Sequence, residues 1–119
     1  MKITPTIPTL EENFKLLDLF LKLSDNWNGY GAKPFSHILI QKVKDIIKDL
    51  EIQLFIFPTA HCTIQLTYWE DLGCYIEFEI SENDKMHLYV ENYDGKTAEL
   101  DVPCTAEMIN RAMHKYFLD

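Results

Sequence analysis

Glu77 and Glu79 are the residues whose type and spacing come closest to a catalytic pattern. They stand two positions apart in CYIEFEI, a stretch with the two-residue alternation of a β-strand. Both carboxylates would therefore project from the same face of a sheet. Paired carboxylates can bind Mg²⁺ or act as general acid and base. One hypothesis for the function is accordingly a small metal-assisted hydrolase that uses Glu77 and Glu79.

The other side chains that could do chemistry are scattered. The four histidines share no metal-ligand spacing and are His37, His61, His87 and His114. The three cysteines form no CxxC pair and are Cys62, Cys74 and Cys104, which indicates reduced thiols in the cytoplasm. No GxGxxG, GxSxG or P-loop pattern occurs. We therefore predict no catalytic residue, no metal site and no cofactor, and favour a function other than catalysis.

The composition indicates one domain with an uneven charge. Hydrophobic residues make up 47% of the 119 residues, enough for one compact core over 1–119. No apolar run is long enough to cross a bilayer and the N-terminus lacks a signal-peptide core, so we expect a cytoplasmic protein without a membrane partner. Residues 70–119 hold twelve acidic and four basic side chains and carry the whole net charge of −8. Phosphate binding requires Lys and Arg, so the charge argues against direct nucleic-acid binding and favours a partner protein with a basic surface.

Two apolar stripes with helical spacing precede the strands. The segment Thr9-Leu10-Glu11-Glu12 has the form of a capping box, and we predict a helix over residues 9–24. Ser36 is the predicted N-cap of a second helix, over residues 36–51. Because both stripes need burial and only residues 25–35 link them, we expect an antiparallel helical hairpin.

After residue 51 the apolar period changes from 3.6 to 2, which predicts an antiparallel β-meander over residues 53–102. Four strands alternate clearly, and a further strand at its start, over residues 53–57, is optional. A final helix is predicted over residues 105–118, with Thr105 as its N-cap, packed on the same sheet face as the first two helices. The expected fold class is α+β.

The alternation assigns each strand residue to one of two sheet faces. The face predicted to meet the helices carries Cys62, Ile64, Leu66, Ile76, Phe78, Leu88, Val90, Leu100 and Val102. The opposite face combines acidic with aromatic side chains, and its predicted partner-binding residues are Gln65, Trp69, Tyr75, Glu77, Glu79, Tyr89, Glu91 and Glu99. Aromatic rings supply rigid contact area and carboxylates select Lys or Arg. The alternative is a solvated sheet face without a partner.

The segment DNWNGYGAKPFS, residues 25–36, joins the two predicted helices. Gly29 and Gly31 allow the positive φ angles that a tight link between helices often requires. Trp27 and Tyr30 are predicted to fill the open end of the helical hairpin against the sheet. The alternative is that these two rings contact a ligand or partner, because function gathers on rigidly held loops.

This loop also resembles a signature. WNGYGA, residues 27–32, followed by Pro34 and Ser36, is similar to the W-D/N-G-Y-G-A-x-P-x-S motif of a family of small, mostly uncharacterised bacterial proteins. Pro58-Thr59 with Ile64-Gln65-Leu66, and Glu77-Phe78-Glu79-Ile80, resemble that family's P-T…I-Q-L and E-x-E-I segments. Cys62 departs from the family's glycine, and Thr67-Tyr68 from its Glu-Trp. The resemblance implies a common fold and an accessory or defence-linked role in bacteria and their phages.

These observations predict a non-catalytic, acidic protein-binding module. Its expected form is an inhibitor, an antitoxin or a phage- or defence-linked regulator that covers a basic, nucleic-acid-handling surface of another protein. The metal-assisted hydrolase is the first alternative. The second is a homo-oligomeric structural protein, although repulsion between like carboxylates opposes pairing of this face with a copy of itself.

Overall fold

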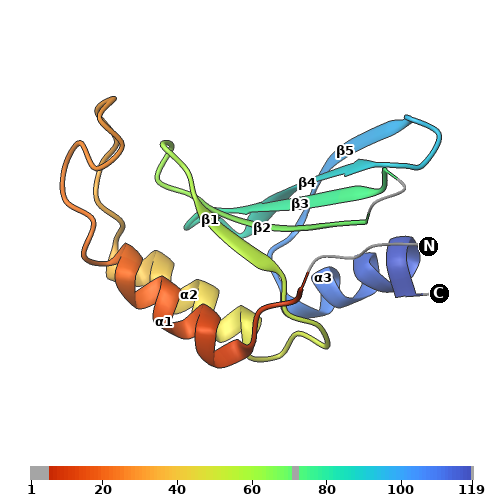
Figure 1. The fold of residues 1–119 in the computed structure, drawn as a ribbon, viewed down its shortest axis with the longest axis horizontal. Coiled ribbons are helices and arrows are strands. Elements are labelled where there is room, and N and C mark those ends of the chain that lie inside the picture. Colours follow the sequence, from red (N-terminus) through yellow and green to blue (C-terminus); the bar gives the residue numbers. More distant parts are fainter. Residues whose placement is uncertain (1–5, 71–72, 119) are drawn as a thin grey trace.

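The fold is α+β, as predicted. The structure, a computed structural model, describes residues 6–70 and 73–118. In this part of the chain three α-helices and five strands follow one another in the order α-α-β-β-β-β-β-α. The strands form one antiparallel sheet in the order β1-β2-β3-β4-β5, so the optional first strand is present. The three helices lie on one side of the sheet (Figure 1).

The first two helices begin at the predicted caps. α1 (Leu10–Phe20) starts with a complete capping box, because Thr9 Oγ1 accepts from the Glu12 N–H at 3.0 Å and Glu12 Oε1 accepts from the Thr9 N–H at 2.9 Å. α2 (His37–Ile47) starts after Ser36, whose Oγ accepts from the third N–H beyond it at 3.1 Å. The side-chain pattern therefore determined both starting points.

Both helices end four residues before the predicted ends at 24 and 51. α1 stops at Phe20 and α2 at Ile47. After each helix the chain tightens into three-residue hydrogen bonds, in which the Lys22 N–H donates to Leu19 O at 3.0 Å and the Asp49 N–H to Ile46 O at 3.2 Å. The apolar stripe continued past each end because residues in the following turn also pack on the core.

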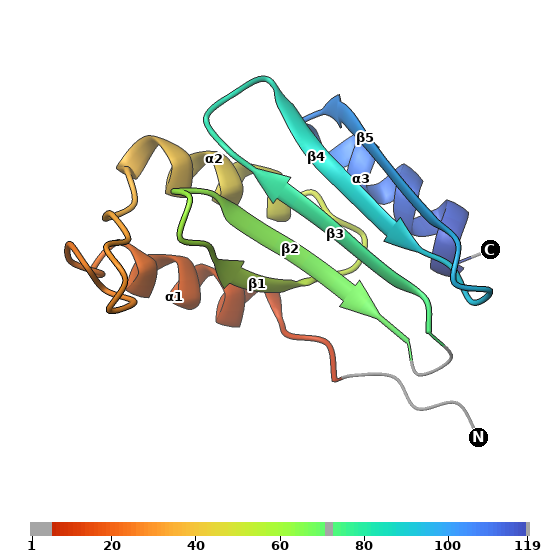
Figure 2. The same ribbon diagram turned by 90° about the horizontal axis from the view of Figure 1, so that it is seen from above.

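The sheet is a meander in which each strand pairs with the next. Its strands are β1 (Phe55–Pro58), β2 (Ile64–Trp69), β3 (Tyr75–Ile80), β4 (Lys85–Glu91) and β5 (Thr97–Pro103). Figure 2 shows the strands side by side, with β1 and β5 at the two margins. A short hairpin joins β4 to β5, and Gly95 within it has a φ of 79°.

The core lies between the helices and one face of the sheet. Leu17 of α1, Val43 of α2 and Ile109 of α3 are buried in one cluster with the inward side chains of the central strands, such as Phe78. Each buried side chain of this kind contributes about 1.5–3 kcal/mol. The meander alternation predicted this face correctly for β2, β3 and β4.

Two residues predicted on the buried face are exposed. Cys62 lies in the turn before β2, with a φ of 60°, because the strand starts only at Ile64. Leu100 is 48% exposed because β5 is an edge strand, in which Val102 is the buried residue. The alternation correctly predicted which sheet face Leu100 is on, but not that its side chain is half exposed.

The C-terminal segment is helical but changes form. α3 (Ala106–Met113) begins after Thr105, whose Oγ1 accepts from the Met108 N–H at 3.2 Å, and a π-helical turn, η1 (His114–Leu118), follows it. Phe117 in this turn packs edge-on against Tyr68 of β2, with ring centroids 4.9 Å apart. None of the helices in the described residues is long and apolar enough to span a membrane.

Candidate functional site

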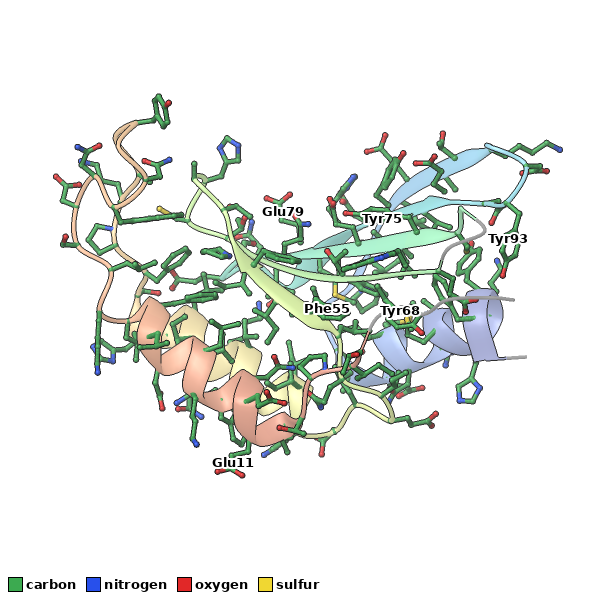
Figure 3. The ribbon with its side chains drawn as sticks, in the orientation of Figure 1. Glu11, Phe55, Tyr68, Tyr75, Glu79 and Tyr93 are labelled. Carbon is green, nitrogen blue, oxygen red and sulfur yellow. The ribbon has the colours of Figure 1, made fainter. Side chains whose placement is uncertain are left out.

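The strand register brings all eight predicted partner-binding residues together on one sheet face. Together with Thr67, His87 and Asp101, they form three rows across the strands. The row nearest the β2–β3 turn contains Trp69, Tyr75 and Glu91. The middle row contains Thr67, Glu77, Tyr89 and Glu99. The third row contains Gln65, Glu79, His87 and Asp101. We call these three rows the acidic–aromatic face, and Figure 3 shows Tyr75 and Glu79 on it, away from the helices.

Aromatic rings occupy the part of this face that is nearest the β2–β3 turn. Tyr75 and Tyr89 lie at an angle of 63° with centroids 6.1 Å apart, and Trp69 packs on Phe55 of β1 at 4.8 Å. Contacts of this kind contribute about 0.5–1.5 kcal/mol beyond the buried area. The rings are therefore held by one another before any partner arrives, so little side-chain freedom remains to be lost on binding.

Hydroxyl groups bind the carboxylates in the middle of the face. The Tyr75 hydroxyl donates to Glu77 Oε1 at 2.7 Å, and the Tyr89 hydroxyl donates to Glu91 Oε2 at 3.2 Å. Thr63, just before β2, donates its hydroxyl hydrogen to Glu79 Oε2 at 2.8 Å. Because these donors are neutral, they orient the carboxylates and leave their negative charge intact.

The two tyrosines are held in the neutral form. Burial, followed by the hydrogen bond to Glu77, raises the pKa of Tyr75 to about 12, although a hydrogen bond from Thr67 acts in the opposite direction. Burial and the carboxylate of Glu91 also raise the pKa of Tyr89. Both hydroxyls therefore remain hydrogen-bond donors at neutral pH.

His87 is the basic group within the rows, and it bridges two carboxylates of β5. Its Nε2 lies 2.7 Å from Glu99 Oε1 and its Nδ1 lies 3.1 Å from Asp101 Oδ1. These hydrogen bonds, with the Glu99 contact the larger, raise the pKa of the imidazole. The alternation also predicts His87 and Asp101 on this face, in phase with Tyr89 and Glu99, although the eight predicted contact residues do not include them.

The carboxylate pair does not form a metal centre with its neighbours. In residues 6–70 and 73–118 no three His, Cys, Asp or Glu side chains are grouped so that they could hold an ion. Glu77 and Glu79 point to the same side of β3, but each is bound by a different hydroxyl donor. What this arrangement presents is a set of fixed negative charges rather than a cation cage.

The loop between α1 and α2 is organised by asparagines. Asn28 Oδ1 accepts from the N–H of Tyr30 at 2.8 Å and of Ala32 at 3.1 Å. Gly29 and Gly31 have φ angles of 79° and 90°, as their place in a tight link predicts. Main-chain amides of the loop are thus satisfied within the loop itself.

The two aromatic residues of this loop have different surroundings. Trp27 Nε1 donates to Lys33 O at 3.0 Å, and its ring packs on the core residue Phe35 with centroids 5.9 Å apart. Tyr30 is 93% exposed. The prediction that both rings fill the end of the helices is therefore wrong for Tyr30, because the Asn28 turn places it at the tip of the loop.

Comparisons with known proteins give no relative from which a function could be inferred. No protein-family model matches the chain, and no curated protein or solved structure matches it either. The resemblance carried by residues 27–32 and 77–80 stays a prediction. The function is therefore argued from the geometry of the acidic–aromatic face.

Proposed function

We propose that this protein is a non-catalytic binding module whose acidic–aromatic face covers a basic surface of another protein. One observation carries the proposal, namely that the three rows contain five carboxylates and no lysine or arginine. These carboxylates are Glu77, Glu79, Glu91, Glu99 and Asp101. Among the described residues their ion pairs are with His87. Most of the negative charge is thus left for a partner.

The spacing of these carboxylates suits a partner that normally handles phosphate. Carboxylates that share a row, Glu77 with Glu99 and Glu79 with Asp101, stand two strands or about 10 Å apart, and those on one strand stand about 7 Å apart. A protein surface that binds nucleic acid through Lys and Arg would meet regularly placed negative charges of this kind. An inhibitor, an antitoxin or a phage- or defence-linked regulator would act in this way.

The proposal includes the role of the helices. We infer that α1 and α2 form an antiparallel helical hairpin which, with α3, covers the apolar sheet face and leaves the acidic–aromatic face open. An ion pair between Lys44 of α2 and Asp18 of α1 supports this arrangement. We also place the protein in the cytoplasm, which the odd number of cysteines and the lack of a CxxC pair support.

The test compares two variants that change the net charge equally. Glu77→Gln with Glu79→Gln removes two carboxylates from the face and keeps an acceptor for each hydroxyl donor. Glu11→Gln with Glu107→Gln removes two carboxylates from α1 and α3, where each side chain is 79% exposed. Each protein is used to capture partners from a lysate of the native host, at low and at high salt, and the captured proteins are identified by mass spectrometry.

We expect the wild type to retain a basic protein that high salt releases. The Glu77/Glu79 variant should bind it about tenfold or more weakly, because two direct charge contacts are lost. The Glu11/Glu107 variant should bind it as the wild type does. Equal affinity for all three proteins, or an equal loss in both variants, would show that this face is not the contact surface.

A further inference from the structure

The outer edge of β5 presents unpaired main-chain groups. The Asn92 N–H donates to Lys96 O at 2.8 Å across the β4–β5 hairpin. Because the pairs of an antiparallel ladder alternate, Ala98, Leu100 and Val102 direct their main-chain groups toward β4, and Thr97, Glu99 and Asp101 direct theirs outward. β5 is the last strand of the sheet, and within the described part of the chain these outward groups have no hydrogen-bond partner.

The same edge has different chemistry on its two sides. On the acidic–aromatic side, Glu99 and Asp101 project as exposed carboxylates, 61% and 67% exposed. On the helix side, a hollow lies between strands β4 and β5 and the C-terminal helical segment of α3 and η1. Its apolar lining is Leu88, Leu100, Val102, Met108, Ala112 and Tyr116. Arg111 of α3 and Lys115 of η1 also line it, so this side would repel a basic side chain.

The side chains of an incoming strand would therefore be divided alternately between the two sides of this edge. Successive residues of a strand point to opposite faces. Lys or Arg at every second position would lie beside Glu99 and Asp101. The residues between them would lie over Leu100 and the apolar hollow. Such a strand would also satisfy the outward main-chain groups, which is the usual basis of recognition by strand addition.

A second copy of the chain is the less suitable occupant. If two β5 strands paired antiparallel around Leu100, Glu99 of each copy would lie opposite Asp101 of the other. Four carboxylates would then meet on one face, and like charges directly opposite each other destabilise a strand pair. The charges at this edge thus disfavour pairing with a second copy and favour pairing with a basic strand.

We propose that an extended segment of the partner, with Lys or Arg at every second residue and apolar residues between them, adds to β5 as a sixth, antiparallel strand. This inference rests on the proposed function, since it takes the partner to be basic. It adds the mode of binding, in which main-chain hydrogen bonds supply part of the affinity and the alternation supplies the specificity.

The probe is a short peptide of alternating lysine and valine, with two matched derivatives. One derivative carries methyl groups on the main-chain nitrogens of its lysines, which would face β5 in an antiparallel pair. The other carries them on the nitrogens of its valines, which would face solvent. All three peptides have the same charge, so electrostatic attraction alone cannot separate them.

Amide exchange with solvent is measured by NMR on the whole protein as each peptide is added. We expect the unmethylated and valine-methylated peptides to slow the exchange of the Thr97, Glu99 and Asp101 amides about tenfold near saturation. The lysine-methylated peptide should bind about tenfold more weakly, because it lacks the N–H groups that pair with β5.

Three outcomes would overturn the inference. The first is equal binding of both methylated peptides, and the second is no binding of any peptide at about 1 mM. The third is that the three amides exchange slowly without any peptide, and more slowly as the protein concentration is raised. The last outcome would indicate a second copy at the edge. The proposed function is judged separately by the Glu77/Glu79 variant, so acidic-face binding without strand addition would be recognised.

Discussion

The two edges of the sheet are built differently. β1 has four residues, ends at Pro58 and carries the buried Ile56, which is 4% exposed. α1 lies against this edge, and Asn13 of α1 donates to Leu54 O just before the strand at 3.0 Å. β5 has seven residues, most of them exposed, and its outward main-chain groups face solvent.

One sheet can thus have one edge protected against pairing with another strand and the other edge open to it. Short length, a proline and a covering helix are the usual protections of an edge against pairing with other chains, and β1 has all three. β5 ends in Pro103, but its other protection against pairing is the charge of Glu99 and Asp101. These carboxylates repel an acidic strand and attract a basic one.

The two edges should differ most in how much the loss of an apolar side chain lowers the free energy of unfolding. Ile56→Ala should lower the free energy of unfolding by about 3 kcal/mol, because it leaves a cavity under β1. Leu100→Ala should lower it by less than about 1 kcal/mol, because the side chain is half exposed already. Urea unfolding of both variants checks the difference. Similar losses at the two positions would mean that β5 is as well covered as β1.

The contact between α1 and the β1 edge can be disrupted by a substitution that creates no large cavity. Asn13 is 2% exposed and donates its Nδ2 hydrogens to Gln53 Oε1 and Leu54 O, each at 3.0 Å. Asn13→Leu should lower the free energy of unfolding by about 2 kcal/mol, because both acceptors lose a donor in a region with little water. Asn83→Leu, at an exposed turn, is the control and should change stability by less than about 0.5 kcal/mol. Equal effects in urea unfolding would show that Asn13 does not hold α1 to this edge.

The sequence was sufficient for features that depend on neighbouring residues. The cap at Thr9 and the strand alternation around Phe78 predicted where α1 starts and which side chains of the central strands are buried. Such signals are local, so one short segment contains all the information. The eight predicted contact residues share a face for the same reason, since a common phase is enough to place them there.

What the sequence did not determine depends on how elements meet. Leu100 has the phase of a buried residue, but its exposure depends on how far α3 extends beneath β5. The contacts of His87 with Glu99 and Asp101 depend on the register between two strands, which the alternation alone does not give. Tyr30 is exposed because Asn28 Oδ1 accepts from its main-chain N–H and so holds the turn, a detail of geometry that residue type alone does not determine.

The smallest expected effect is a pH dependence that belongs to the β5 edge alone, because β1 contains no titratable side chain. Glu99 and Asp101 raise the pKa of His87, so protonated His87 stabilises the fold. This contribution is complete below the unfolded pKa, about 6.5, and is lost as the pH rises through the higher folded pKa. An NMR titration of the imidazole should show the raised pKa of His87, and Asp101→Asn should lower that pKa.

Binding of a lysine–valine peptide should strengthen over the same pH range, because deprotonation of His87 restores the full negative charge of the edge. Binding that is constant across this range would mean that Glu99 and Asp101 do not contact the basic residues.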